Sequence, residues 1–539
     1  MGAVASHSHG DPNCGPTRST EHQVDEESYD SYEATRMLLT RLIEGLDFLE
    51  VRGPLDREIA SVKDDSRQVA SHDLFVAIKG LQQDAHTYAP KAVERGATAV
   101  VVERWLELPE TITQVLVPNC RRALGYLAAS WHGFPTRRMV TIGVTGTDGK
   151  STTCNLIAHI LNEAGHKSGI ISTVGAWTGA SRVETGLHTT TPEPMALQGY
   201  LAEMASSGVD YAVVEVSSHG LDQDRVFGCE FDVAVMTNVT PEHLDYHHTY
   251  DEYLRAKLKL FHMVSEKRTK PDVPRVIAYN ADDSSAKLVR RLPADVAISY
   301  GIENRAQLRA FDIDLSPSGT DFHVRHGSKR TRLTSRLWGR FNVYNVLAAV
   351  AACWSQPGVT ENVLREAVGQ FDGIPGRMEL VDCGQDFTVV VDFAHTPNGL
   401  RQVVETARHL TEGRTIVVFG CPGLRDRGKR PEMGRIACEL AHLTVVTGDD
   451  SRTEDVNAIS QEIAVGCREA GGVEGREYYL IPDRREAIRF AVEHAAPSDT
   501  VLLAGYGHQR TMAVGDQELP WNEVEEARQA IELAQACRA

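Results

Sequence analysis

The stretch Val140-Thr-Ile-Gly-Val-Thr-Gly-Thr-Asp-Gly-Lys-Ser-Thr-Thr153 decides the fold of this 539-residue chain. A β-branched run leads into a glycine-rich turn, and a lysine and hydroxyl side chains follow the turn. Backbone N–H groups in such a turn can surround a phosphate, the lysine can reach the outer phosphates, and Ser151 can offer its hydroxyl to Mg²⁺. The segment is therefore predicted to hold a nucleoside triphosphate through Gly146, Thr147, Asp148, Gly149, Lys150, Ser151 and Thr152. A purely structural glycine-rich turn is the alternative, and the strict P-loop pattern has Gly where this chain has Val144.

Composition narrows the class of protein. The formal net charge is −18 and the isoelectric point is near 5.6, which argues against a nucleic-acid-binding surface. The ten cysteines are scattered without a C-x-x-C pair, as expected for reduced thiols in the cytoplasm. No apolar run approaches the roughly 20 residues that a membrane span needs. We expect a cytoplasmic monomer that binds small molecules, without disulfides, a membrane partner or a nucleic-acid partner.

The chain is too long for one hydrophobic core. Residues 1–36 are rich in His, Ser, Gly and acidic residues, so a disordered tail is predicted there. Strands and helices then alternate in three stretches, at 37–137, 138–337 and 338–539. Such alternation favours an α/β fold with mostly parallel sheets, in which ligands bind beyond the carboxyl ends of the strands.

Particular elements follow from hydrophobic periodicity. An amphipathic helix is predicted to open at Met37, another helix is predicted over Tyr253–Phe261, and residues 296–332 alternate like an antiparallel sheet edge. The predicted buried strands are Leu74–Ile78, Ala99–Val102, Val115–Val117, Tyr211–Val214, Val233–Met236, Val389–Val391, Thr415–Phe419, Leu443–Val446 and Val501–Leu503.

Two strand ends carry residues suited to a divalent metal. Glu215 follows one predicted strand and His243 follows the next, so with Ser151 they can hold a metal against phosphates; a surface Glu and a helix-capping His are the alternative. Lys257 lies among apolar neighbours on the predicted helix, and its spacing alone indicates an ordinary solvated lysine.

Six segments, taken in order, make the chain resemble the Mur ligases, ATP-dependent amide-forming enzymes of peptidoglycan precursor synthesis. They are Gly143–Thr153, Thr190-Thr-Pro-Glu-Pro194, Glu215-Val-Ser-Ser-His219, Asn238-Val-Thr-Pro-Glu-His-Leu-Asp245, Gly339-Arg-Phe-Asn-Val-Tyr-Asn345 and Asp392-Phe-Ala-His-Thr-Pro397. Three more resemble the MurE branch, which adds the third residue, usually a diamino acid, to UDP-MurNAc-L-Ala-D-Glu. These are Asp65-Ser-Arg67, Gly423-Leu-Arg-Asp-Arg-Gly-Lys-Arg-Pro431 and Asp449-Asp-Ser-Arg452.

The resemblance implies an N-terminal domain for the UDP moiety, a central P-loop ATPase and a Rossmann-like C-terminal domain that brings the amino acid. It implies Mg²⁺ on Ser151, Glu215, His243 and a carbamylated Lys257, with Lys150, Lys257, Glu215 and His243 serving catalysis. Nucleotide contacts from the hinge and third domain would be Asn342, Asn345, Arg377 and Asp392. The UDP-MurNAc-dipeptide would meet Ser66, Thr190, Thr191, Ser217, Gln223 and Arg225. The incoming amino acid would meet Arg425, Asp449, Asp450, Arg452, Gly505 and Gln509.

The amino-acid loops depart from the family pattern. Asp449-Asp-Ser-Arg452 stands where the diaminopimelate-specific pattern is Asp-Asn-Pro-Arg, and Gly505-Tyr-Gly-His-Gln509 replaces the usual Gly-Lys-Gly-His-Glu. Arg452 is retained, and its planar guanidinium suits the distal carboxylate of diaminopimelate. Gln509 stands where the family pattern has a Glu that would pair with the distal ammonium of the substrate. We hypothesise that Asp450 supplies the missing negative charge.

Several readings stay open at this point. The expected reaction adds meso-diaminopimelate, with L-lysine or another amino acid as the alternative. A ligase recruited to a specialised pathway, a folylpolyglutamate synthetase and a non-catalytic nucleotide-binding partner are further alternatives. A P-loop GTPase is disfavoured because no Asn-Lys-x-Asp motif is present.

Overall fold

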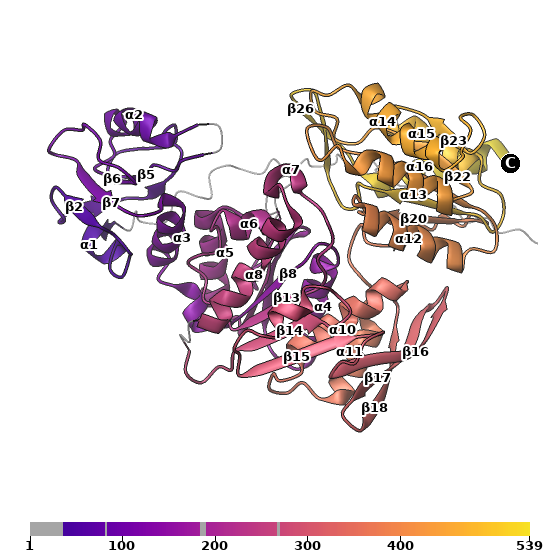
Figure 1. Cartoon of the computed structure of the whole chain (residues 1–539), viewed down its shortest axis with the longest axis horizontal. Coiled ribbons are helices and arrows are strands. Elements are labelled where there is room, and N and C mark those ends of the chain that lie inside the picture. Colours follow the sequence, from indigo (N-terminus) through magenta and orange to yellow (C-terminus); the bar gives the residue numbers. More distant parts are fainter. Residues whose placement is uncertain (1–35, 81–82, 184–189, 267–269, 539) are drawn as a thin grey trace, which may run out of the picture.

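The computed structural model describes residues 36–80, 83–183, 190–266 and 270–538, which form three units. A small N-terminal unit lies at one end, a large central unit lies in the middle, and a C-terminal unit packs beyond it (Figure 1). Each unit has its own sheet with strands that run parallel and are covered by helices, which confirms the predicted α/β class. No helix in the described ranges is both long and apolar enough to cross a bilayer. Apart from Arg36, the predicted tail lies outside the described residues.

The N-terminal unit is a five-stranded sheet in the order β2-β7-β6-β5-β4, with β2 antiparallel to the rest. Its strands are β2 (Glu50–Arg52), β4 (Val62–Lys63), β5 (Leu74–Val76), β6 (Ala99–Val102) and β7 (Thr113–Leu116), and its helices are α1 (Leu39–Leu42), α2 (Ala89–Glu94) and α3 (Cys120–Trp131). The helix predicted from Met37 begins later. Met37 and Leu38 form strand β1, which pairs with β3 (Glu58–Ile59), so sheet pairing overrides the helical pattern there.

The central unit holds an eleven-stranded sheet in the order β11-β10-β9-β12-β8-β13-β14-β15-β16-β17-β18. The strands are β8 (Val140–Thr145), β9 (Ser168–Ser172), β10 (Gly175–Trp177), β11 (Arg182–Val183), β12 (Tyr211–Glu215), β13 (Val233–Met236), β14 (Val276–Asn280), β15 (Val296–Gly301), β16 (Leu308–Ser316), β17 (Gly319–His326) and β18 (Lys329–Ser335). The antiparallel edge predicted for residues 296–332 is only partly right. β16 to β18 are antiparallel, but β15 pairs in parallel with both β14 and β16.

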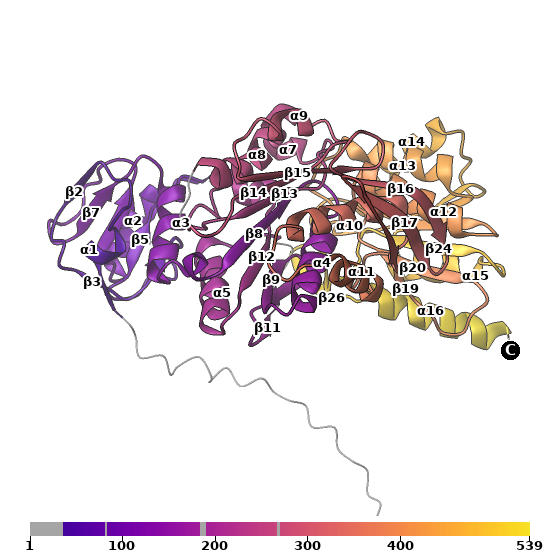
Figure 2. The same ribbon diagram turned by 90° about the horizontal axis from the view of Figure 1, so that it is seen from below.

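Helices cover both faces of this sheet (Figure 2). Side chains alternate between faces along each strand: Tyr211 and Val213 of β12 pack on one side, and Ala212 and Val214 pack on the other. The first face is covered by α4 (Lys150–Glu163), α10 (Arg340–Cys353) and α11 (Glu361–Gln370). The second is covered by α5 (Pro194–Ser206), α6 (Ser218–Asp222) and α8 (Tyr250–Glu266), with the short α7 (Leu244–His247) and α9 (Ala286–Val289) at the sheet ends.

The C-terminal unit is a six-stranded sheet in the order β19-β20-β24-β21-β22-β23, parallel except for the edge strand β19. Its strands are β19 (Glu379–Leu380), β20 (Thr388–Asp392), β21 (Thr415–Phe419), β22 (Leu443–Val446), β23 (Tyr478–Leu480) and β24 (Thr500–Ala504), followed by the hairpin β25 (Thr511–Val514) and β26 (Gln517–Pro520). Helices α12 (Pro397–Leu410), α13 (Lys429–Leu440) and α14 (Val456–Glu469) cover one face, and α15 (Arg484–Glu493) and α16 (Glu523–Arg538) cover the other.

The boundary between the last two units differs from the expected position at residues 337 and 338. Helices α10 and α11 follow that position, yet their apolar side chains up to Ile374 belong to the core of the central sheet. The core of the C-terminal unit first includes residues near Met378 and Val381. We therefore propose that the boundary lies near residue 375.

Candidate active site

One large cavity, of about 1290 Å³, opens between the central and C-terminal units at the carboxyl ends of their parallel strands. It is lined by the P-loop, by the ends of β12 and β13, by α10, and by the loops after β20, β21, β22 and β24. Almost all predicted site residues line this cavity. The exceptions are Gly146 and Lys257, which lie behind its wall, and Ser66, which lies in the N-terminal unit.

The P-loop has the backbone conformation that a phosphate cradle needs. Gly146 and Gly149 have φ angles of 149° and 81°, and α4 begins directly after Gly149. A Cβ on Gly146 would lie 1.8 Å from Thr237 Oγ1, and one on Gly149 would lie 2.1 Å from Asn345 Oδ1. A side chain at either position would collide with these atoms, and the turn leads directly into α4, as the sequence predicts. Anion binding by this turn stays a prediction.

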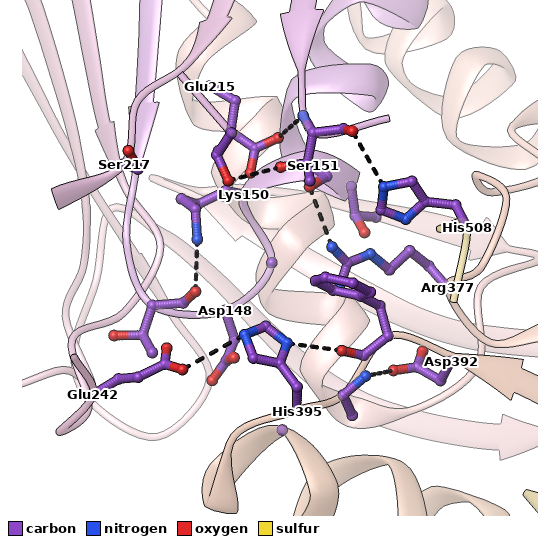
Figure 3. Close-up of a pocket in the computed structure, with 18 of the residues that line it drawn as sticks. Asp148, Lys150, Ser151, Glu215, Ser217, Glu242, Arg377, Asp392, His395 and His508 are labelled. Atoms are coloured by element: carbon purple, nitrogen blue, oxygen red, sulfur yellow. Dashed lines mark hydrogen bonds and ion pairs between the residues drawn. The ribbon is translucent and has the colours of Figure 1, made fainter. Parts of the chain in front are cut away.

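Lys150 occupies the mouth of this turn. Its Nζ donates a hydrogen bond to the carbonyl oxygen of Thr147 at 2.7 Å, which folds the ammonium group back over the loop (Figure 3). The residues that follow β13 hold the P-loop in place. Asn238 Oδ1 accepts from the Asp148 N–H, and Thr237 Oγ1 donates to the Asp148 carbonyl. A cation is thus held where the outer phosphates of a nucleotide would lie.

The three predicted metal-binding side chains that line the cavity fit a hard cation chemically. Ser151 and Glu215 are almost fully buried and present oxygen atoms beside the P-loop. The Glu215 carboxylate accepts a hydrogen bond from the Thr173 N–H, which orients it. Burial lowers the pKa of His243 to about 4, with smaller effects from its charged neighbours, so its imidazole is neutral at physiological pH and can act as a ligand.

Lys257 is not the solvated lysine that its spacing indicated. Its side chain is 1% exposed, its Nζ donates to the Gly146 carbonyl at 2.6 Å, and the Tyr253 ring lies 4.3 Å from the ammonium nitrogen. Burial holds the pKa of Lys257 well below its usual value, and the nearby Lys150 lowers it further. A buried lysine with a lowered pKa therefore lies directly behind the P-loop.

Four residues from α10 and the C-terminal unit close the nucleotide side of the cavity. Arg377 donates to Ser151 Oγ at 3.4 Å, and its guanidinium lies 4.5 Å from the centre of the Phe393 ring. The Asp392 carboxylate accepts from the N–H groups of Met378 and Ala394. Asn345 donates to Asn342 Oδ1 at 2.8 Å, and this hydrogen bond orients both side-chain amides beside the P-loop. The structure therefore brings these predicted residues together.

A buried acid that sequence reasoning missed joins the two units. Glu242 is 5% exposed, and its carboxylate lies 3.5 Å from His395 Nε2 and 3.8 Å from Lys429 Nζ (Figure 3). His508 adds a second cross-unit contact, because its Nε2 lies 3.1 Å from the Thr173 carbonyl oxygen. Glu242 and His395 stand inside quoted motifs, but their pairing spans more than 150 residues, so only the tertiary structure shows it.

The predicted dipeptide-binding residues line the cavity wall near the N-terminal unit. Thr191 and Ser217 share a hydrogen bond of 3.1 Å, and Arg225 donates to Gln223 and to the Thr191 carbonyl. Arg225 also pairs with Glu193 at 2.8 Å. The remaining residues of this set are Thr190, in the same wall, and Ser66, which the structure does not place in the cavity.

The predicted amino-acid pocket combines charges of both signs. Arg425 and Arg452 line it from the loops after β21 and β22, and burial of the Arg425 guanidinium together with the charge of Arg452 lowers the pKa of Arg425. Two acids, Asp449 and Asp450, face them, and Gly505 and Gln509 complete the lining. Gly505 has a φ of 111°, which keeps the backbone close to Asp449. Two guanidiniums near each other favour a ligand with carboxylates.

The loop that carries Arg425 is held by a buried ion-pair network. Arg430 has no exposed side-chain surface and donates to both carboxylate oxygens of Glu454, which also accepts from the Leu424 N–H. Glu462 lies 2.8 Å from the same guanidinium. Hydrogen bonds from Arg430 lower the pKa of Glu454 to about 2 despite partial burial.

Glu454→Gln is expected to destabilise the C-terminal unit by about 2 kcal/mol at pH 7. Because the pKa of Glu454 is lower in the folded state, its carboxylate stabilises the fold fully above the unfolded-state pKa near 4.5, and this stabilisation is lost as the pH falls toward 2. The difference in unfolding free energy between Glu454→Gln and wild type therefore shrinks over that pH range. Denaturant unfolding followed by fluorescence between pH 7 and pH 3 measures this. Glu439→Gln is the matched control, because Glu439 forms an exposed pair with Arg435 on α13. Equal losses in both variants would contradict the prediction.

Comparison with protein families and known structures agrees with this architecture. Three family models match consecutive parts of the chain: the Mur ligase family catalytic domain at residues 58–132, the Mur ligase middle domain at 144–353, and the Mur ligase glutamate ligase domain at 376–507. The last two models meet between residues 353 and 376, close to the boundary seen in the hydrophobic cores.

Relatives match along nearly the whole chain. A UDP-N-acetylmuramoyl-L-alanyl-D-glutamate--2,6-diaminopimelate ligase of Syntrophomonas wolfei is 41% identical over 487 residues, covering 90% of this chain and 97% of its own length. The enzyme of the same name from Bacillus licheniformis is 40% identical and covers 92% of this chain and 99% of its own. A solved structure of a ligase with this name covers 93% of this chain and all of its own, with a TM-score of 0.63 and 30% identity. Given a similarity of this extent, the chain belongs to the Mur ligase family and is a ligase.

Proposed function

We propose that this ligase adds meso-diaminopimelate to UDP-MurNAc-L-Ala-D-Glu with ATP. The names of its relatives state a ligase that joins 2,6-diaminopimelate to UDP-N-acetylmuramoyl-L-alanyl-D-glutamate. The observation that carries the proposal is the large cavity between the central and C-terminal units. It gathers a P-loop, a polar wall for an acceptor and a pocket with two arginines and two acids. The nucleotide, the acid to be activated and the amine would thus meet in one space, which suits peptide bond formation in the synthesis of cell-wall precursors.

The first step would join two anions, because the D-Glu carboxylate must attack the γ-phosphate of ATP. Lys150 would offset the repulsion between them and the charge that develops on the transferred phosphoryl group. Arg377, which reaches Ser151 from the C-terminal unit, would add a second cation to the same phosphates. The product of the step is an acyl phosphate and ADP.

Mg²⁺ fits the oxygen and imidazole donors beside the P-loop. Ser151, Glu215 and His243 would hold it, and Lys257 would contribute once carbamylated. When bound, the ion would supply charge neutralisation at the phosphates. In its unprotonated form the amine of Lys257 can attack CO₂ and lose a proton to form an N–COO⁻ group, which turns a buried base into an anion.

The second step would be attack of the amino group on the activated carbonyl, with phosphate leaving from the tetrahedral intermediate. The C-terminal unit would present the amino acid through the loops that follow β21, β22 and β24. Contacts across the cavity, from His395 to Glu242 and from His508 to the Thr173 carbonyl, would keep the units together and limit the access of water to the acyl phosphate.

The charge pattern of the pocket favours diaminopimelate over L-lysine. Diaminopimelate carries two carboxylates and two amines, and the pocket offers Arg425 and Arg452 for the carboxylates. L-lysine has only one carboxylate, so it would leave one of the two guanidiniums without a substrate carboxylate. A substrate that meets only one of the two guanidiniums would therefore bind less tightly than one that meets both.

The decisive test incubates the purified protein with ATP, Mg²⁺ and UDP-MurNAc-L-Ala-D-Glu against meso-diaminopimelate, L-lysine and L-ornithine. Phosphate release and product mass are the readouts. We expect amide product with meso-diaminopimelate, at a kcat/KM at least about 100-fold above that with L-lysine, as loss of a paired charge implies. Product only with another amino acid would overturn the substrate assignment. An absence of product with every amino acid would favour a recruited ligase or a non-catalytic partner.

A further inference from the structure

The two departures from the family pattern in the amino-acid loops contact each other. The Tyr506 hydroxyl donates to Asp450 Oδ1 at 2.6 Å, and the Ala513 N–H donates to the same oxygen at 2.9 Å. Tyr506 stands where the pattern has Lys, and Asp450 stands where it has Asn. Tyr506 is fully buried and Asp450 is 4% exposed, so the bond is shielded from water. The two changes therefore act as a pair.

A buried arginine fixes both loops behind this pair. Arg484 donates to the Gly448 carbonyl, directly before Asp449, and to the Ala504 carbonyl, directly before Gly505. Its guanidinium lies 4.9 Å from the centre of the Tyr506 ring and forms three hydrogen bonds to the buried Glu523. The ring thus has little freedom, and the direction of its hydroxyl is set before any ligand enters.

The place of Asp450 in the cavity indicates which group of the amino acid it meets. Asp450 Oδ2 lies 3.9 Å from Arg452 Nη2, the guanidinium proposed to bind the distal carboxylate. In diaminopimelate the distal carboxylate and the distal ammonium are attached to the same carbon. A carboxylate on Arg452 therefore brings that ammonium within reach of Asp450.

We infer that Tyr506 is a positioning residue for amino-acid selection: its hydroxyl orients the Asp450 carboxylate toward the distal ammonium of the substrate. This inference rests on the proposed function and deepens it, since it selects amino acids with both a distal carboxylate and a distal ammonium. On this inference, Asp450 supplies the carboxylate that is absent at Gln509, and Tyr506 holds it in the required orientation.

The test compares meso-diaminopimelate with 2-aminopimelate, which lacks only the distal amino group. Tyr506→Phe keeps the ring and removes the hydroxyl. We expect kcat/KM for diaminopimelate to fall about tenfold through KM, as loss of a hydrogen bond to a charged group implies, while that for 2-aminopimelate stays within about twofold. The KM for ATP should not change. Asp450→Asn should show the same selective loss, and adding Tyr506→Phe to it should cause little further loss.

Tyr211→Phe is the matched control, because Tyr211 is buried, its hydroxyl bonds Gln356, and it does not line the cavity. Equal losses for both amino acids in Tyr506→Phe, or a parallel rise in the KM for ATP, would show a merely structural role and overturn the inference. Unchanged kinetics would overturn it as well. Wild-type enzyme that forms product with another amino acid but none with diaminopimelate would refute the proposed function, and the role of Tyr506 would fall with it.

Discussion

Lys257→Met is expected to lower kcat roughly 10³-fold, the largest of the expected effects, because it removes the negative charge of the proposed Lys257 carbamate, which water cannot replace in a closed site. Methionine fills the same buried volume, so folding should be retained. The side chain lies behind the P-loop on the Gly146 carbonyl, where the lowered pKa of Lys257 favours the unprotonated amine that reacts with CO₂. Steady-state phosphate release with all three substrates measures the loss.

Two further measurements separate carbamylation from simple packing. Intact-mass analysis under native, CO₂-containing conditions should show the mass of one CO₂ on wild type, and acidification should remove it. Lys257→Glu, which restores an anion, should recover part of the activity that Lys257→Met loses. Lys259→Met is the control, since Lys259 lies on the same helix but is partly exposed and pairs with Asp222. Full activity of Lys257→Met would contradict the assignment.

Arg452→Ala is expected to raise the KM for meso-diaminopimelate about 100-fold and leave the KM for ATP within about twofold. The Arg452 guanidinium donates to the Gly423 carbonyl and lies 3.9 Å from the Asp450 carboxylate, so its orientation in the pocket is set before a ligand binds. Arg452→Lys should recover only part of the loss, because an ammonium cannot bind a carboxylate with two parallel hydrogen bonds.

L-lysine provides the internal control for this prediction. It has no distal carboxylate, so its low rate of use should barely change in Arg452→Ala. A fall in L-lysine use by the same factor would mean that the substitution disturbs the loop rather than a substrate contact. Arg476→Ala, which removes an exposed guanidinium paired with Glu477, should leave every constant unchanged.

The sequence by itself determined the phosphate cradle and the α/β class. Gly146 and Gly149 have positive φ angles, which favour glycine, and the strand and helix that flank them follow from local periodicity, so neighbouring residues suffice to predict the turn. Strands such as Ala99–Val102 and Thr415–Phe419 were found at their observed bounds for the same reason. The motifs also indicated most of the residues that line the cavity.

Only the tertiary structure decided what depends on distant partners. Met37 joined a strand because Ile59 pairs with it, and α10 and α11 belong to the central core although they follow its last strand. Lys257 has a polar side chain on a helix, and its burial arises from the P-loop and Tyr253 packed over it. The contact of Tyr506 with Asp450 joins two loops that are 56 residues apart. Hydrophobic periodicity indicates which face of an element is buried, but it does not indicate which other segment buries it. The pairing proposed to control amino-acid selection is of this kind, so only the tertiary structure shows it.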